Sequence, residues 1–403
     1  MASYKCAKKS HKTATVEQEV CRIAKEIEGN DDLVTKILLF LPARPLFRFK
    51  LVSKRWTSLI SNPYFSSLWS PEPSPSALIL QVLSRPKDPC CISLKDEAIT
   101  VIHRGVIDFV KDDPSDCVEI LNSCGGLIVC HRLKQIVGRA KWINEYIVCN
   151  PTTKQFTTLP KPIMTSFDMS LAFDHSISLH YKVINVSLFH IEIYSSETNL
   201  WKQCRAQFPK PFQSPHIYGK GVFFNGAIFW TLMSLRSFYY FDIDDTEVLH
   251  SHPMPKMDIE YYFGCVDEHL YLVGSSVSEW PQLDIFELGH DYSSWSLKYR
   301  IDLHGVAGVK QMVYSTRDFF SLKFSVFSVV TRKEGNNQEP YLVFYIPGQL
   351  ILVSFKNNHC SKLRKLPVYA SAEMLRSFNG IKRDYHLIEN PFWIGNKLSS
   401  IGL

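Results

Sequence analysis

The chain has 403 residues, more than one hydrophobic core usually serves unless that core is a barrel or a ring of repeats. Its formal charge of +6 is small for this length and falls short of the concentrated basic stripe that nucleic-acid binding requires. Aromatic residues make up 13%, and 22 prolines and 18 glycines punctuate the chain, which favours many short strands over long helices.

The cysteines and the apolar segments bear on the cellular compartment. The 11 cysteines are odd in number and irregularly spaced, and no apolar signal segment follows Met1, so we expect reduced thiols in the cytoplasm or nucleus and no secretion. The most apolar late stretch, residues 341–355, is interrupted by Pro347-Gly348 and is too short to cross a bilayer. The sequence therefore predicts no membrane association.

The first 69 residues contain two predicted parts. Residues 1–20 are polar and basic and are predicted to be disordered. Within residues 21–69, Asn30 is a suitable N-cap, and Asp31 and Asp32 place negative charge in the first turn of a helix. Apolar residues then recur at helical spacing up to Pro42, at Leu33, Val34, Ile37, Leu38 and Leu41.

Two further helices are predicted before a linker. Pro45 suits the first turn of a second helix that carries Leu46, Phe49 and Leu51. Ser53 is the expected cap of a third, which has Trp56, Leu59 and Ile60 on one face and ends at Asn62-Pro63. Residues 70–76 alternate proline with polar residues, which is typical of an extended, semi-rigid linker, and the composition changes abruptly beyond it.

Residues 77–403 contain short β-rich runs separated by turn signals. Asn225-Gly226 is a strong signal for a two-residue hairpin turn, and Asp267-Glu268 is expected to turn a similar one. The runs recur with a loose period of roughly 40 to 50 residues, which is typical of propeller blades. The modules are 121–160, 171–201, 221–243, 263–295 and 324–367, with a weaker one in 77–118. Stacked units that close into a ring leave few exposed edges, so we expect an all-β propeller, with six blades.

Residues 30–56 resemble the F-box. The matching features are the Asp-Asp-Leu start at Asp31, the Ile-Leu…Leu-Pro sequence from Ile37 to Pro42, and the Val-Ser-Lys-Arg-Trp run from Val52. The rest of the chain is similar to the F-box-associated domain of a large plant family. The residues that carry this similarity are Ser123-Cys124-Gly125-Gly126-Leu127, Asn150-Pro151-Thr152-Thr153-Lys154, Leu159-Pro160, Leu171-Ala172-Phe173-Asp174 and Trp295-Ser296-Leu297.

The resemblance implies a small three-helix F-box followed by a kelch-like propeller, and recruitment of proteins for ubiquitination. The apolar first helix agrees with this, because a unit of about 40 residues is too small to bury so much apolar surface alone, and such a patch usually marks a partner. The residues expected to contact a Skp-type adaptor are Leu33, Ile37, Leu38, Leu41, Pro42, Leu51, Val52 and Lys54. Those expected to form the internal F-box core are Trp56, Leu59 and Ile60.

Other chemical signals are interpreted as structural. His250-Ser251-His252 has a spacing that metal sites use, but no third ligand is suggested nearby. Cys124-Gly125-Gly126 lacks the Gly-Lys-Ser/Thr of a phosphate loop, and its glycines are better suited to close backbone approach between strands. Trp201, Trp230 and Trp295 occur near equivalent module positions and indicate packing between blades. No catalytic constellation, metal site or cofactor motif is predicted.

The main hypothesis is a non-catalytic substrate-recognition subunit of an SCF (Skp–cullin–F-box) ubiquitin ligase. The F-box would dock on the Skp-type adaptor of the cullin-containing ligase, and the propeller would hold an unknown client protein. Two alternatives remain at this stage. One is a kelch-type propeller enzyme, and the other is an adaptor-bound scaffold that acts outside ubiquitination.

Overall fold

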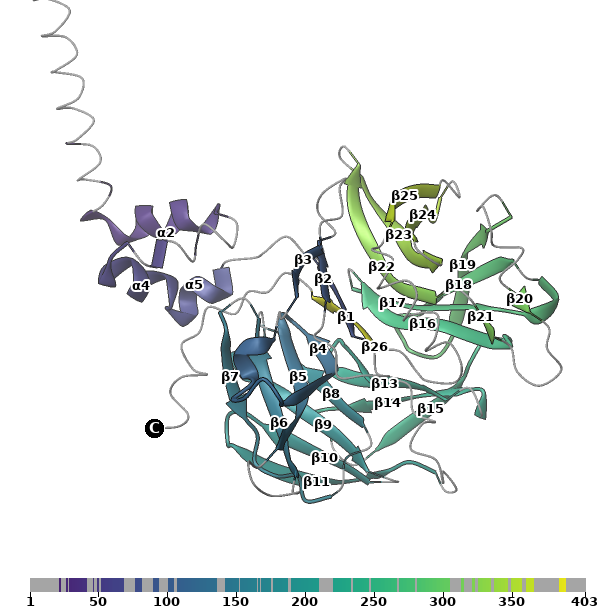
Figure 1. Ribbon diagram of the computed structural model, residues 1–403, viewed down its shortest axis with the longest axis horizontal. Helices are drawn as coiled ribbons and strands as arrows, with labels where there is room; N and C mark the ends of the chain where they lie inside the picture. Colours follow the sequence, from purple (N-terminus) through teal and green to yellow (C-terminus); the bar gives the residue numbers. More distant parts are fainter. Residues whose placement is uncertain are drawn as a thin grey trace, which may run out of the picture. The chain divides into compact units, whose positions relative to one another are not determined.

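The computed structural model divides the chain into two compact units (Figure 1). Glu72–Pro391 form one unit, and the residues before Glu72 belong to the other. The structure describes residues 22, 27, 29–41, 46, 49–50, 52–68, 77–81, 90–93, 101–104, 107–135, 142–151, 153–164, 166, 168–174, 177–187, 190–209, 220–232, 235–245, 248–266, 268–279, 281–304, 313–314, 321–322, 325–334, 337–346, 349–356, 360–365 and 384–388. The predicted tail at 1–20 and the predicted linker at 70–76 lie outside these residues.

The N-terminal unit contains helices α2 (Asp31–Leu39), α4 (Lys54–Ile60) and α5 (Pro63–Leu68). Both expected N-caps are confirmed. The Asn30 side chain accepts hydrogen bonds from the backbone N–H groups of Asp32 and Leu33, and the Ser53 hydroxyl accepts one from Trp56. These bonds satisfy donors that a helix start otherwise leaves unpaired.

The helices differ from the expectation at one point. The sequence predicts that Asn62-Pro63 end the third helix. α4 does end at Ile60, just before this pair, but Pro63 then begins a further helix, α5, which was not predicted. Proline suits the first helical position, because a backbone N–H at this position would have no acceptor within the helix. Most of the second expected helix lies outside the described residues. Of this stretch the structure describes Leu46, Phe49 and Lys50, and all three are helical.

Five sheets of the second unit are each built from four consecutive antiparallel strands. They correspond to the five stronger modules expected from the sequence. Their strands are β4 (Cys117–Cys124), β5 (Leu127–Gln135), β6 (Trp142–Asn150) and β7 (Gln155–Thr158); β8 (Asp168–Ala172), β9 (Lys182–Ser187), β10 (His190–Ser195) and β11 (Leu200–Gln207); β12 (Val222–Phe224), β13 (Ala227–Leu232), β14 (Ser237–Asp242) and β15 (Leu249–Pro253); β16 (Ile259–Val266), β17 (His269–Ser275), β18 (Gln282–Leu288) and β19 (Trp295–Asp302); and β22 (Ser325–Glu334), β23 (Asn337–Ile346), β24 (Gln349–Ser354) and β25 (Cys360–Lys365). We name each blade by its first and last strands.

A further four-stranded sheet combines strands from both ends of the unit. Its order is β26 (Asp384–Ile388), β1 (Ala77–Gln81), β2 (Cys90–Ser93) and β3 (Val101–Arg104). The expectation that residues 77–118 form a module of their own is therefore wrong. Cys117 already begins β4 of the next sheet, and β1 pairs instead with β26 near the C-terminus, in the register Ile79↔His386. A small two-stranded sheet, β20 (Val313–Tyr314) with β21 (Ser321–Leu322), precedes β22.

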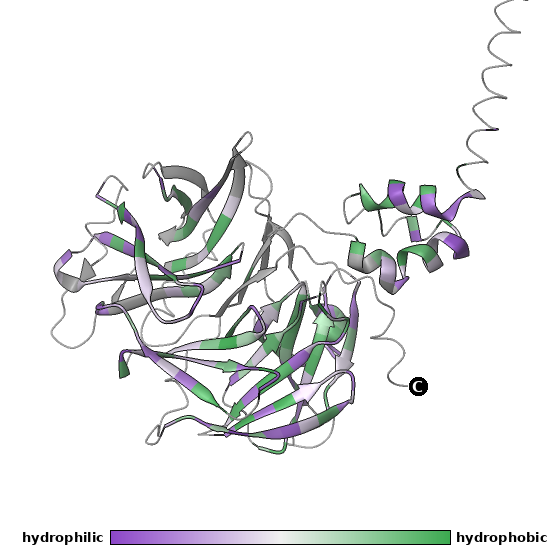
Figure 2. Ribbon diagram, turned by 180° about the vertical axis from the view of Figure 1, so that it is seen from behind, coloured by the Kyte–Doolittle hydropathy of each residue, from purple (hydrophilic) through white to green (hydrophobic). Residues whose placement is uncertain are grey.

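The four-stranded sheets are arranged as a closed ring, in which one edge strand of each sheet contacts those of the two neighbouring sheets. Strand β4 contacts β8, which contacts β12, then β16, β22 and β26, and β26 contacts β4 again. This is the arrangement of a β-propeller, as expected from the sequence. Hydrophobic residues recur along the strands of the blades in Figure 2.

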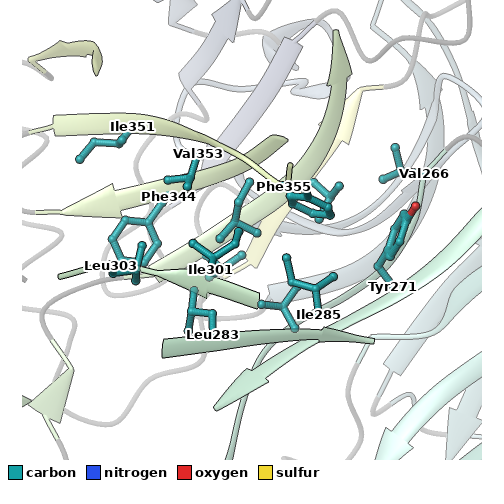
Figure 3. Packing of buried hydrophobic residues seen from close by; sticks show 14 residues of the cluster. Val266, Tyr271, Leu283, Ile285, Ile301, Leu303, Phe344, Ile351, Val353 and Phe355 are labelled. Atoms are coloured by element: carbon teal, nitrogen blue, oxygen red, sulfur yellow. The ribbon is translucent and has the colours of Figure 1, made fainter. Parts of the chain in front are cut away.

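The hydrophobic cores lie between neighbouring blades. One core joins the β16–β19 blade to the β22–β25 blade, where Leu283, Ile301 and Phe344 are fully buried and lie close together (Figure 3). A second joins β8–β11 to β12–β15, and a third joins β12–β15 to β16–β19. Because each blade buries one face against each neighbour, no blade has a complete core alone.

Three turns agree with the sequence. Asn225 and Gly226 both adopt positive φ, +47° and +81°, between paired strands β12 and β13, which is the geometry of a two-residue hairpin turn. Glu268, with φ of +62°, lies in the turn between β16 and β17. At Gly125 (φ +54°), a Cβ atom would approach the Phe173 carbonyl oxygen of the next blade to 2.8 Å. The predicted close backbone approach at this glycine is therefore confirmed.

Candidate functional site

The core of the N-terminal unit is small and consists of apolar residues from all the described helices. Five side chains are buried together, and aromatic and aliphatic residues that are partly exposed pack around them. The buried residues are Val34, Leu38, Leu46, Ile60 and Phe65. Of the predicted core residues, Ile60 is fully buried, whereas Trp56 and Leu59 are partly buried; the Trp56 ring lies 5.0 Å from that of Phe49.

Leu38 was predicted to lie on the adaptor-contacting surface, and this prediction is wrong. It is only 1% exposed and belongs to the internal core. The apolar face of α2 is wide, and the 3.6-residue period directs Leu38 inward together with Val34, one turn earlier. A side chain enclosed in this way offers no surface to a partner.

Three large apolar side chains lie on the outside of α2 and at its C-cap. Leu33 is 42% exposed, Ile37 51% and Phe40 89%. They are spaced i, i+4 and i+7, so they form one face of the helix, which we call the α2 apolar stripe. Leu33 and Ile37 were predicted as contact residues, but Phe40 was not. Phe40 could have been predicted from the sequence, because it extends the periodicity of Leu33 and Ile37 by one further turn.

The other predicted contact residues are placed in different ways. Val52 and Lys54 are exposed, and Leu41 is partly buried against the core. Pro42 and Leu51 lie outside the described residues. Tyr64 and Leu68 on α5 are exposed apolar residues that were not predicted as contact residues, because no further helix was expected after Asn62-Pro63.

An ion pair orients α4 against α2. The Nε and Nη2 atoms of Arg55 lie 2.8 and 2.5 Å from Oδ1 of Asp31. Both side chains are substantially exposed, so the pair contributes at most about 1 kcal/mol to stability. Nearby in the sequence, burial lowers the pKa of the Lys50 ammonium to about 8. The unit is therefore held together by apolar packing, with charge in a minor role.

In the propeller, the tryptophan and cysteine side chains contribute to packing. Trp230 is fully buried in the second strand of its blade, whereas Trp201 and Trp295 lie at the start of fourth strands. Trp201 and Trp295 therefore occupy equivalent positions in their blades, as expected, whereas Trp230 does not. The Trp201 indole N–H donates to the Pro160 carbonyl at 2.8 Å. A side-chain hydrogen bond with Cys149, together with burial, raises the pKa of the Cys130 thiol. Among the described residues, no group of three or more His, Cys, Asp or Glu side chains is arranged to hold a metal ion.

A small helical unit with an exposed apolar stripe, followed by a β-propeller, defines a two-domain protein of the F-box class. The F-box domain family matches residues 30–68, and the F-box associated beta propeller domain family matches residues 79–248. The F-box protein At5g07610 of Arabidopsis thaliana is 33% identical over 364 residues, which cover 83% of this chain and 84% of that protein. The chain therefore belongs to the plant family of F-box proteins that carry an F-box-associated β-propeller domain.

Other similarities are weaker. The F-box protein At5g49610 of Arabidopsis thaliana is 26% identical over 238 residues, which cover 53% of this chain and 61% of that protein. A solved nidogen/laminin complex is similar over 72% of this chain and 95% of that chain, with a TM-score of 0.41 and 9% identity. In the part of the chain that the structure describes, no helix has the length and apolar character to span a membrane.

Proposed function

We propose that this protein is the substrate-recognition subunit of an SCF ubiquitin ligase. Its F-box docks on a Skp-type adaptor, which links it to a cullin, and its propeller recruits a client protein. The observation that carries the proposal is the α2 apolar stripe, in a unit whose match to the F-box family spans the same helix. Fully burying an aliphatic or aromatic side chain contributes roughly 1.5–3 kcal/mol, so the stripe alone can supply several kcal/mol of association.

In this proposal the chain performs no chemistry of its own. It raises the effective concentration of client lysines near a conjugating enzyme that the ligase brings to the complex. Membership of the F-box family supports this role, and no observation favours a propeller enzyme. A scaffold that binds the adaptor without ubiquitination uses the same two surfaces, and reconstitution with cullin distinguishes the two functions.

Replacing Ile37 with aspartate is expected to weaken adaptor binding at least 100-fold. Ile37 is half exposed, so the unit tolerates a charge there, but an unpaired carboxylate buried in an interface costs several kcal/mol. The measurement is titration calorimetry of the full chain with the Skp-type adaptor. Ser58→Asp, at an exposed position of α4 outside the stripe, is the matched control and should bind as the unmodified chain does. Unchanged affinity in Ile37→Asp would remove the α2 apolar stripe from the interface.

We also propose that the ring has six kelch-like blades, that the F-box spans residues 21–69, and that the propeller spans residues 77–403. The support for the sixth blade is that β26 pairs with β1 and contacts both β4 and β22. Joining the first and last strands in one sheet holds the ring shut. Ending the chain before Asp384 is therefore expected to lower the unfolding temperature of the propeller by several degrees. An unchanged transition in differential scanning calorimetry would show that β26 does not close the ring.

A further inference from the structure

Strand β15 differs in composition from most outer strands of the propeller. Outer strands present unpaired backbone groups, and proteins commonly place charged residues there to prevent unwanted pairing. β3, β11, β19 and β25 all contain Lys or Arg, whereas β15 reads Leu249-His250-Ser251-His252-Pro253. β7 also lacks a charged residue, but its Phe156 ring already packs against Phe109 and Arg132. Among the described outer strands, β15 therefore combines an uncharged edge with aromatic groups that remain accessible.

Within the described part of the chain, β15 pairs with β14 along one edge and with no strand along the other. β15 is the last strand in the sheet order β12-β13-β14-β15, and the Met254 N–H donates to the Arg236 carbonyl at 2.9 Å. Alternate residues of a strand point the same way, so His250 and His252 direct their backbone groups toward β14. Leu249 and Ser251 direct theirs outward. Pro253 has the same parity as these two, which agrees with its lack of an N–H to donate.

A ladder of stacked rings crosses the same blade and ends at β15. Phe229, Tyr240 and His250 lie on adjacent strands, with successive ring centroids 5.3 and 4.7 Å apart and interplanar angles of 23° and 14°. His252 stacks in the same way on Phe238, at 5.5 Å and 23°. The final ring, His250, is exposed to solvent.

The inner rings of the ladder are held in place from the neighbouring blade. The Tyr292 ring meets Phe229 and Tyr240 edge-on, at 5.1 and 5.3 Å. The Asn225 side-chain amide donates to the Tyr292 hydroxyl at 2.8 Å. The ladder is therefore preorganised up to its exposed end, and a ligand that extends it does not have to order these rings.

We propose that β15 receives an extended segment of the client as a fifth, antiparallel strand, with an aromatic side chain opposite His250. The open backbone groups of Leu249 and Ser251 define a β-strand as the occupant, and the ladder selects an aromatic residue. A residue opposite His250 occupies a non-hydrogen-bonded pair, in which the Cα atoms are only about 4.5 Å apart and the side chains approach most closely. This deepens the client-recognition half of the proposed function.

The test uses the full-length chain and two labelled peptides, Ser-Thr-Tyr-Thr-Tyr-Thr-Ser and the same sequence with leucine in place of tyrosine. Fluorescence anisotropy should show the tyrosine peptide binding at least tenfold more tightly. His250→Ala should abolish that preference, whereas His304→Ala, at an exposed histidine of another blade, should keep it. Ser251→Pro removes an outward N–H and should prevent binding of both peptides, whereas Ser251→Thr should not.

Amide hydrogen exchange completes the test. The Ser251 amide should exchange rapidly in the free chain and slow down when the tyrosine peptide is added. Equal affinity for the two peptides, no binding at millimolar peptide, or binding that survives Ser251→Pro would each overturn the proposal. So would slow exchange without peptide, which shows the edge to be covered by the chain itself or, where it depends on protein concentration, by a second copy. Adaptor binding measured on the same preparations separates a failure of this site from a failure of the F-box assignment.

Discussion

Replacing Trp230 with alanine is expected to lower the free energy of unfolding of the propeller by roughly 3–5 kcal/mol. Trp230 is fully buried in the core that joins the β8–β11 blade to the β12–β15 blade. The Phe208 ring, from the chain that follows β11, meets it edge-on at 5.3 Å. Removing the indole leaves a cavity between two blades. Because the blades form a closed ring, neither can move far enough to fill that cavity.

Denaturant unfolding followed by near-ultraviolet circular dichroism measures this loss. Trp142→Ala is the matched control, because Trp142 is exposed and its removal opens no cavity, so we expect a change within about 0.5 kcal/mol. Equal effects of the two substitutions would contradict a core located between blades.

Replacing Arg132 with methionine is expected to destabilise the β4–β7 blade, toward the lower end of the roughly 3–5 kcal/mol that loss of one partner of a buried ion pair costs. Arg132 is 3% exposed, and its Nε and Nη2 atoms lie 2.8 and 2.5 Å from Oε2 of Glu145. Its Nη1 donates to the Val110 carbonyl and to Asp112. The substitution leaves the Glu145 carboxylate and the Val110 carbonyl without these donors.

A double-mutant cycle identifies the cause of that loss. Adding Glu145→Met to Arg132→Met removes the unpaired carboxylate, so part of the lost stability should return. A double variant that loses the sum of the two single effects would show that Arg132 acts through its apolar stem and not through the ion pair. Asp112 remains hydrogen-bonded to Lys134, whose contact is the main cause of its lowered pKa, and so should contribute little to the cycle.

The five blades made of consecutive strands were predictable, because each repeats apolar runs and turns within a short stretch of sequence. The turn at Asn225-Gly226 and the close approach at Gly125 were also predictable from local sequence, because glycine is the residue that best tolerates positive φ and close backbone contact. The remaining sheet was not, because β1 pairs with β26, about 300 residues away, and no local pattern encodes a pairing over that distance.

The candidate site was predictable as a helix but not in the direction of its side chains. α2 has a wide apolar face beside a polar face that carries Asp31, Asp32 and Lys36, so its periodicity marks a helix without stating which part of the apolar face turns inward. Leu38 was therefore assigned to the surface although it is buried, and Phe40 was left out although it is the most exposed of the described large apolar residues. Packing against Ile60 and Phe65, which come from later helices, decides between these faces.

The most direct test of the proposed function compares the proteins captured from plant cells by the unmodified chain and by its Ile37→Asp variant, using quantitative mass spectrometry. The variant is expected to lose the Skp-type adaptor and cullin together, while the proteins bound by the propeller stay and accumulate because they are no longer degraded. The F-box and the propeller fall in separate compact units, so damage to the α2 apolar stripe should not reach the client surface. Capture of adaptor and cullin by the variant, or loss of every captured protein together, would contradict the proposed function.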